Sequence, residues 1–243
     1  MRLVFLLLMI FASINLFAGE IYWYAAASAA KPAAEIVELY NKTFEDKLIL
    51  ITGGSGQLLN KIVISKLGDI YSPASTVYAE KAMGEINFVP QKLLKQRLVF
   101  GISRRAEDKI NSFADLLEND VKIALGNPET MSAGKIFYIK IFPELESGMK
   151  KRLLANKLID SVNISQTVNY IKSEVVDAGL LFDSTARANG IKYIEMPENL
   201  RFDAFYYIGV TKFAKNPSDV NKTINFIKSQ KNIFEKYGFE MAE

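Results

Sequence analysis

The sequence predicts an α/β protein with mainly parallel sheets. The first observation is that short apolar runs alternate along the chain with stretches in which apolar residues recur at helical spacing. This alternation is typical of βαβ units, in which a helix connects two parallel strands. The second observation is the composition: 49% of the 243 residues are hydrophobic and 23% are charged, as expected for a globular chain of one or two domains.

Six short apolar runs are the predicted strands, and an amphipathic helix follows each of the first two. In both helices the apolar residues fall on one face, which we expect to be buried. The last predicted helix stops at Gly238, a residue type common just beyond a helix end. The strands are Ile21–Tyr24, Leu48–Thr52, Leu98–Ile102, Lys122–Leu125, Ala178–Phe182 and Tyr206–Val210, and the apolar helix positions are Ala33, Ile36, Val37, Tyr40, then Leu58, Leu59, Ile62, Val63, and finally Ile224, Ile227, Phe234 and Tyr237.

Residues 19–243 are enough for either one large domain or two lobes of similar size. No stretch rich in Pro, Gly and Ser separates two halves. If there are two lobes, we therefore expect extended strands to cross between them, and Arg97–Ile102 and Phe205–Val210 are the candidates.

The composition also excludes several classes of function. The chain has neither histidine nor cysteine, so His-based triads, thiolate nucleophiles, ordinary zinc sites and disulfides are ruled out. The 30 Lys and Arg against 27 Asp and Glu give a net charge of +3, and the basic residues form no cluster longer than Lys150–Arg152. This charge pattern lacks the electrostatic footprint of a nucleic-acid-binding protein, so we expect no nucleic-acid partner.

The first 18 residues are typical of a secretory signal peptide. Arg2 supplies the early positive charge, Leu3–Phe11 is an apolar run too short for a comfortable membrane span, and Ala18 is a small residue at the expected cleavage point. No cysteine follows that could carry a thioether-linked lipid. We expect a protein that is free in the periplasm, with no lipid anchor and a mature chain of residues 19–243.

Three strand-to-helix junctions are unusually rich in small residues. A helix start exposes backbone N–H groups without intrahelical partners and carries the positive end of the helix dipole. Small residues let an anion approach that backbone, so several such junctions at one cleft predict an anion site. For any one junction taken alone, capping serines and turn glycines are the better explanation; the three junctions together make the anion site as good an explanation. The junctions are Ala25–Pro32, Thr52–Gln57 and Gly126–Lys135.

The enzymatic alternatives are weaker. Ser28 with Lys31, and Ser132 with Lys135, match the S-x-x-K spacing of serine acyltransferases, but the companion motifs S-D-N and K-T-G are absent. A Ser/Lys acyltransferase or hydrolase that uses Ser28 and Lys31 stays open as the alternative of another class. The Gly53–Gln57 segment misses the nucleophile-elbow pattern by its last residue, and Gly134-Lys135 lacks the rest of a phosphate-binding loop.

The same junctions carry a resemblance to the molybdate-binding proteins of ABC importers. The matching segments occur in order over almost the whole mature chain: Tyr24–Ser28, Gly53–Leu59 with Lys61-Ile62, Gly68–Tyr71, Gly126–Glu129 with Ala133-Gly134, Asp177–Leu180 and Glu235–Phe239. The resemblance implies a two-lobed type II periplasmic-binding-protein fold, with helices on both faces of its sheets and two crossing strands. It places 19–97 and 206–243 in lobe 1 and 98–205 in lobe 2.

The resemblance also implies a function and a binding site. The protein would capture molybdate or tungstate for a membrane permease, without catalysis, cofactor or bound metal cation; we expect a monomer. Ser28 and Ser55 would donate hydroxyls and backbone N–H groups to the oxyanion, and Ala133 and Ile164 would donate backbone N–H groups. Many relatives have a tyrosine hydroxyl at the position of Phe182, which has no donor, so that Tyr24 or Ser184 is a candidate substitute. Within the same class, the alternative ligand is sulfate or another small oxyanion.

Overall fold

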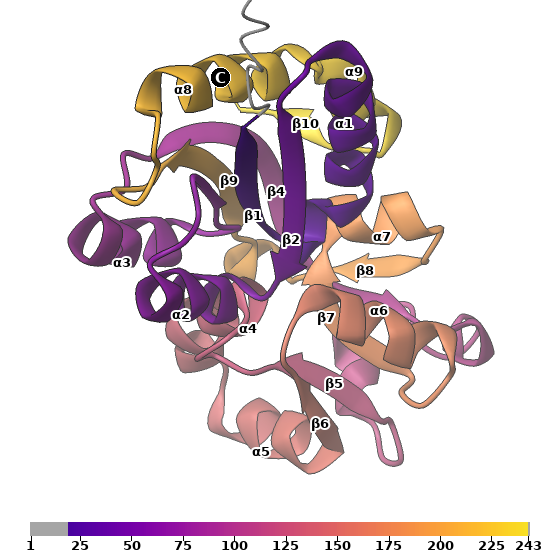
Figure 1. The fold of residues 1–243 in the computed structure, drawn as a ribbon. Coiled ribbons are helices and arrows are strands. Elements are labelled where there is room, and N and C mark those ends of the chain that lie inside the picture. Colours follow the sequence, from indigo (N-terminus) through magenta and orange to yellow (C-terminus); the bar gives the residue numbers. More distant parts are fainter. Residues whose placement is uncertain (1–18, 243) are drawn as a thin grey trace, which may run out of the picture.

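The computed structural model describes residues 19–242 and contains two α/β halves, one above the other in Figure 1. The predicted signal peptide, residues 1–18, lies outside the described residues. In the first half, the central strand β1 (Glu20–Ala26) pairs in parallel with β2 (Lys47–Gly53) and with β3 (Ile70–Ser72). The helices of this half are α1 (Ala30–Thr43), α2 (Ser55–Ser65), α3 (Thr76–Ile86), α8 (Pro217–Ser229) and α9 (Lys231–Lys236).

The helices of the first half cover both faces of its sheet, because alternate residues of β1 point to opposite sides. Trp23 packs into one core cluster with Ile36 of α1, and Tyr24 packs into a second cluster with Leu59 of α2. This arrangement brings the starts of α1 and α2 to the same edge of the sheet, the edge that faces the other half.

The second half repeats the parallel arrangement. Its strand β5 (Ile123–Gly126) pairs with β6 (Lys157–Ser161) and with β7 (Ala178–Phe182). The helices of this half are α4 (Ser132–Ile136), α5 (Ser147–Asn156), α6 (Ile164–Lys172) and α7 (Asp183–Asn189).

Two long strands cross between the halves. The strand β4 (Gln91–Ile102) pairs with β9 (Asp203–Val210) as far as Arg97, and from Leu98 onward it pairs with β7. The other end of β9 pairs with β3. The short strands β8 (Tyr193–Glu195) and β10 (Glu240–Met241) also pair with β4. Within residues 19–242, every antiparallel pair includes β4 or β9, whereas the remaining pairs are parallel. The lobe boundaries given above remain a prediction.

Two details differ from the predicted helices. Val63, expected on the buried face of α2, is 38% exposed, so that face is narrower than predicted. The last helix is two helices, because Gln230 leaves the helical conformation at φ −83° and ψ 46°. As a result α9 ends at Lys236, before Tyr237, and Gly238 follows at φ +78°, where a residue without Cβ fits best.

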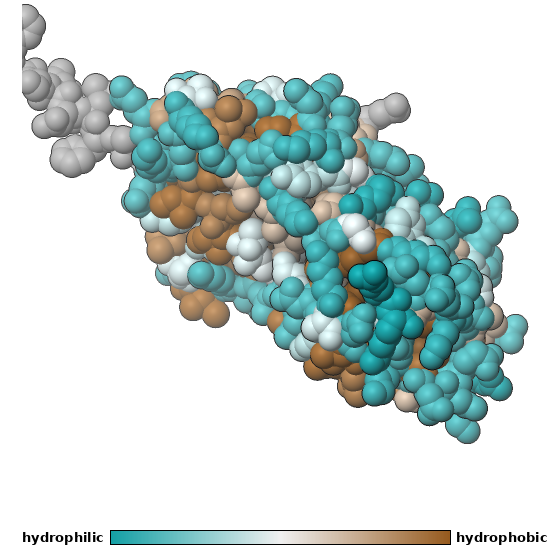
Figure 2. Space-filling view, turned by 90° about the vertical axis from the view of Figure 1, so that its right-hand side faces the viewer, coloured by the Kyte–Doolittle hydropathy of each residue, from teal (hydrophilic) through white to brown (hydrophobic). Residues whose placement is uncertain are grey.

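Polar side chains dominate the face of the molecule seen in Figure 2, with separate hydrophobic patches between them. Within residues 19–242, no helix combines the length and the apolar character needed to cross a membrane.

Candidate anion-binding site

A small cavity of about 10 Å³ lies where the two halves meet. A cavity of this size has room for about one water molecule, so the halves are closed tightly around it. From the first half it is lined by Ala26, Ala27, Ser28, Gly53, Gly54, Ser55 and Ala74, and from the second by Met131, Ser132, Ile164 and Phe182. These residues come from the strand-to-helix junctions that the sequence singled out, together with the starts of α6 and α7.

Four of the five residues predicted to contact the ligand line this cavity: Ser28, Ser55, Ile164 and Phe182. The fifth, Ala133, is fully buried, but its neighbour Ser132 lines the cavity in its place. Whether these residues hold a ligand remains a prediction.

Ser28 provides a buried hydroxyl with no partner. It lies in a single 3-10 turn directly after β1 and is 5% exposed. Within residues 19–242, its Oγ makes no hydrogen bond. A buried hydroxyl normally finds a partner, because leaving one unpaired costs about 1–3 kcal/mol. Ser28 therefore has a hydrogen-bonding group to spare next to the cavity, although Ser103 Oγ and Ser161 Oγ are unpaired as well among the described residues.

Ser55 provides the second hydroxyl, at the first position of α2. Its Oγ accepts a hydrogen bond from the Ala74 N–H at 3.1 Å and another from the Ser132 hydroxyl at 2.8 Å. These bonds fix the Ser55 side chain on the cavity wall.

Backbone groups at the cavity are also arranged as donors. Ser55, Ser132 and Ile164, which line the cavity, are the first residues of α2, α4 and α6, where an N–H has no partner in its own helix. Carbonyl oxygens nearby are already occupied: Tyr206 Oη donates to Ala26 O at 3.2 Å, and Tyr71 Oη donates to Ser55 O at 2.8 Å.

The two tyrosines remain donors at any ordinary pH. Burial raises the pKa of Tyr71 and of Tyr206 far above the usual phenol range. Both phenols therefore keep their protons and go on donating to the carbonyl oxygens of Ser55 and Ala26. Among the described residues that line the cavity none carries a charge, so its polarity comes from neutral N–H and O–H groups.

The sequence missed one hydroxyl at the cavity. Phe182 lies in the cavity wall without a donor, and neither proposed substitute, Tyr24 or Ser184, is among the lining residues. Ser184 instead hydrogen-bonds Gln96 Oε1 at 3.4 Å. The added hydroxyl is Ser132, whose place in a small-residue junction was visible but whose contact with Ser55, 77 residues earlier, was not.

The arrangement does not favour the serine/lysine alternative. A lysine that activates a serine lies within hydrogen-bonding reach of it. Lys31 Nζ donates instead to Ala188 O at 2.7 Å, and Ser28 Oγ has no partner within residues 19–242. Lys135 Nζ, in the second S-x-x-K sequence, pairs with Glu129 at 3.0 Å.

Two glycines at the start of α2 allow the halves to approach closely. Gly56 N–H donates to Thr130 O at 3.0 Å across the cleft. A Cβ on Gly56 would lie 2.3 Å from Glu129 O, and one on Gly54 would lie 2.3 Å from Thr130 O. Any side chain at either position would therefore push the halves apart.

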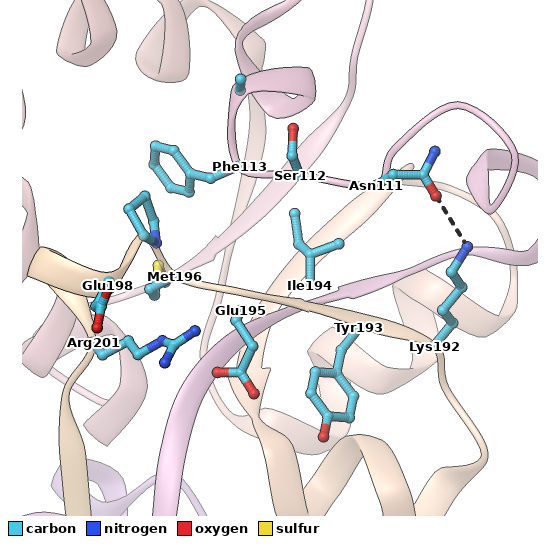
Figure 3. A pocket seen from close by; sticks show the side chains of 12 residues that line it. Asn111, Ser112, Phe113, Lys192, Tyr193, Ile194, Glu195, Met196, Glu198 and Arg201 are labelled. Atoms are coloured by element: carbon cyan, nitrogen blue, oxygen red, sulfur yellow. Dashed lines mark hydrogen bonds between the residues drawn. The ribbon is translucent and has the colours of Figure 1, made fainter.

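A larger groove of about 570 Å³ lies elsewhere, along β8. Figure 3 shows acidic and basic side chains mixed along it, with Lys192 bonded to Asn111 at 3.3 Å. The groove shares no lining residue with the small cavity and lacks its set of converging donors.

Comparisons with known proteins agree on one family. Residues 21–240 match the family described as bacterial extracellular solute-binding protein. A putative ABC transporter substrate-binding lipoprotein of Bacillus subtilis is 26% identical over 228 residues, which are 88% of this chain and 84% of the relative.

Solved structures show the fold. The substrate binding domain of a putative molybdenum ABC transporter from Clostridium difficile matches with a TM-score of 0.63 and 27% identity, over 92% of this chain and 99% of that one. The periplasmic molybdate-binding protein of Azotobacter vinelandii matches with a TM-score of 0.77 over 92% and 100%, at 17% identity. The predicted type II periplasmic-binding-protein fold is confirmed by these matches.

Proposed function

Because this chain belongs to the family of bacterial extracellular solute-binding proteins, we propose that it captures molybdate or tungstate for an ABC importer. The observation that carries the proposal is the unpaired, buried hydroxyl of Ser28, a residue that lines one cavity together with Ser55 and Ser132. The chain works as a binder that hands its ligand to a membrane permease, without catalysing a reaction.

The chemistry of the cavity favours a fully deprotonated oxyanion. Neutral donors stabilise a dianion through charge-assisted hydrogen bonds, each contributing about 1.5–3 kcal/mol. A protonated oxyanion such as monohydrogen phosphate brings a hydrogen to a wall of donors, and no carboxylate lines the described cavity to accept it. We therefore expect discrimination against phosphate at neutral pH.

The choice among dianions rests on two lines of support. The ordered motifs resemble those of molybdate-binding proteins, and the putative molybdenum transporter domain of Clostridium difficile is 27% identical to this chain. Sulfate has the same charge but is smaller, so it would make loose contacts in a cavity adapted to molybdate. Molybdate and tungstate are nearly the same size and are both candidates.

Binding would be coupled to a movement of the halves. The cavity has room for about one water molecule, which is less than an oxyanion with four oxygen atoms needs, so its walls would separate for entry and settle around the ligand. An anion that accepts hydrogen bonds from both halves then favours the closed form, which a permease can distinguish from the open one.

A second candidate ligand is an oxyanion with an organic substituent, such as a phosphate monoester. A neighbouring pocket of about 160 Å³ shares Ala27, Ser28 and Ile164 with the small cavity and contains Lys31 and Asn169. A substituent could occupy this pocket while the oxyanion binds the donors.

A panel of ligands tests the proposal by thermal shift and calorimetry. A ligand at about 100 times its Kd adds about 2.7 kcal/mol to the free energy of unfolding. We expect molybdate and tungstate to raise the Tm most, with sulfate weaker and phosphate inactive. A preferential response to phosphate monoesters would favour the second candidate, and no response to any oxyanion would refute both.

A further inference from the structure

We propose that Ser132 and Ser75 are positioning residues, which together with Ser55 form a chain of hydroxyls that directs the Ser55 proton toward the bound oxyanion. The inference rests on the proposed function and deepens it, since it assigns the residues that select the protonation state of the ligand.

The three hydroxyls are in contact across the two halves. Ser132 Oγ lies 2.8 Å from Ser55 Oγ and 3.1 Å from Ser75 Oγ. Ser55 and Ser75 precede or begin helices of the first half, whereas Ser132 begins α4 in the second. All three side chains are buried. The chain of hydroxyls is therefore complete only when the halves are together.

Counting protons gives the chain a direction. A serine hydroxyl has one proton and two acceptor lone pairs. Both lone pairs of Ser55 Oγ are used, because it accepts from the Ala74 N–H and from the Ser132 hydroxyl. The Ser55 proton takes part in neither bond and is free to point into the cavity that Ser55 lines.

Ser75, at the end of the chain of hydroxyls that lies away from the ligand, fixes the same direction. Ser75 is the N-cap of α3, and its Oγ accepts from the Tyr78 N–H at 3.4 Å. Since Ser132 gives its own proton to Ser55, the contact between Ser75 and Ser132 is a hydrogen bond only when Ser75 donates. The protons thus run from Ser75 to Ser132, from Ser132 to Ser55, and from Ser55 toward the ligand.

Because both lone pairs of Ser55 Oγ are already used, Ser55 can donate a hydrogen bond to the ligand but cannot accept one from it. A fully deprotonated oxyanion accepts the Ser55 proton, whereas a protonated one that turns its hydrogen toward Ser55 finds no free lone pair. Without the Ser132 hydroxyl, one lone pair of Ser55 becomes free and Ser55 can accept a hydrogen from the ligand. Ser132 therefore contributes to selectivity as well as to affinity.

The test is calorimetry with molybdate, sulfate and phosphate on the wild-type chain and on three variants at neutral pH. In Ser132→Ala, we expect the ratio of the phosphate Kd to the molybdate Kd to fall by about 10-fold or more, the value of one hydrogen bond to a charged group. Ser132→Thr keeps a hydroxyl and should restore the wild-type ratio. Ser103→Ala removes a buried serine hydroxyl that does not line the cavity, and the ratio should stay unchanged.

Each other outcome has a definite meaning. If Ser132→Ala weakens all three anions equally, or leaves the ratio unchanged, Ser132 serves the fold alone and the inference is overturned. If Ser132→Ala does not fold, Ser132→Gly takes its place, because it removes the same hydroxyl from Ser55. A reduced ratio then supports the inference, and an unchanged ratio overturns it. A wild-type chain that binds none of the anions refutes the proposed function, and the inference fails with it.

Discussion

Replacement of Ser28 by alanine should shift binding and stability in opposite directions. The hydroxyl of Ser28 is buried and has no partner within residues 19–242, so its removal takes no hydrogen bond from the fold. The free energy of unfolding of the ligand-free chain should stay constant or rise, by up to about 1–3 kcal/mol, the cost of an unpaired buried hydroxyl. At about 2–4 °C per kcal/mol for a chain of this size, the Tm would rise by about 12 °C at most.

Oxyanion binding should weaken in the same variant. One charge-assisted hydrogen bond of about 1.5–3 kcal/mol corresponds to a loss of about 10- to 150-fold in affinity. Ser103→Ala is the matched control, because Ser103 Oγ is also buried and unpaired among the described residues but lies outside the cavity. The control should reproduce the stability effect with unchanged affinity. A Ser28→Ala chain that is less stable without ligand and binds with wild-type affinity would show that Ser28 serves the fold and would refute the assigned site.

Two further predictions concern closure and pH. Gly56→Ala places a Cβ 2.3 Å from Glu129 O, so the halves should close incompletely and the affinity for the oxyanion should fall by about 10-fold or more. The control is Gly148→Ala, which has open space around its position and should leave the affinity unchanged. Calorimetry measures the affinity of both variants, and small-angle scattering measures the closure. Hydrogen bonds from Lys236 and from a neighbouring phenol lower the pKa of Glu35 below its ordinary value of 4.5. The stability that this carboxylate adds is present above pH 4.5 and is lost as the pH falls through the lowered pKa, so the Tm of Glu35→Gln should decrease less in acid than that of the wild type.

The sequence predicted the parallel strands β1, β2, β5 and β7 because each of them is a short apolar run. The strand β7 coincides with the predicted Ala178–Phe182. The sequence reasoning missed β3, which is only three residues long, and β6, an edge strand that is polar and half exposed. It also missed the first half of β4, where Lys92, Lys95 and Arg97 interrupt the apolar pattern. Strands with one solvated face give a weak signal of this kind.

The candidate site was predicted only in part, because the sequence pattern marks single segments and not the contacts between them. Ser28 and Ser55 stand out because small residues follow an apolar strand, and that pattern is local. The role of Ser132 depends on a contact between residues far apart in the chain, and the break at Gln230 depends on how α9 packs against α1. Local periodicity does not encode either contact.

The crossing of β4 and β9 has a consequence for the order in which the molecule acquires its structure. The first half is discontinuous: β9 and the buried residues Ile224 and Ile227 of α8 complete its sheet and core, yet they are synthesised after the whole second half. A nascent chain that has passed β7 already contains β5, β6 and β7, whereas β3 is paired with β1 on one side and still lacks β9 on the other. The first half can therefore complete its sheet and core only after β9 and α8 have been synthesised.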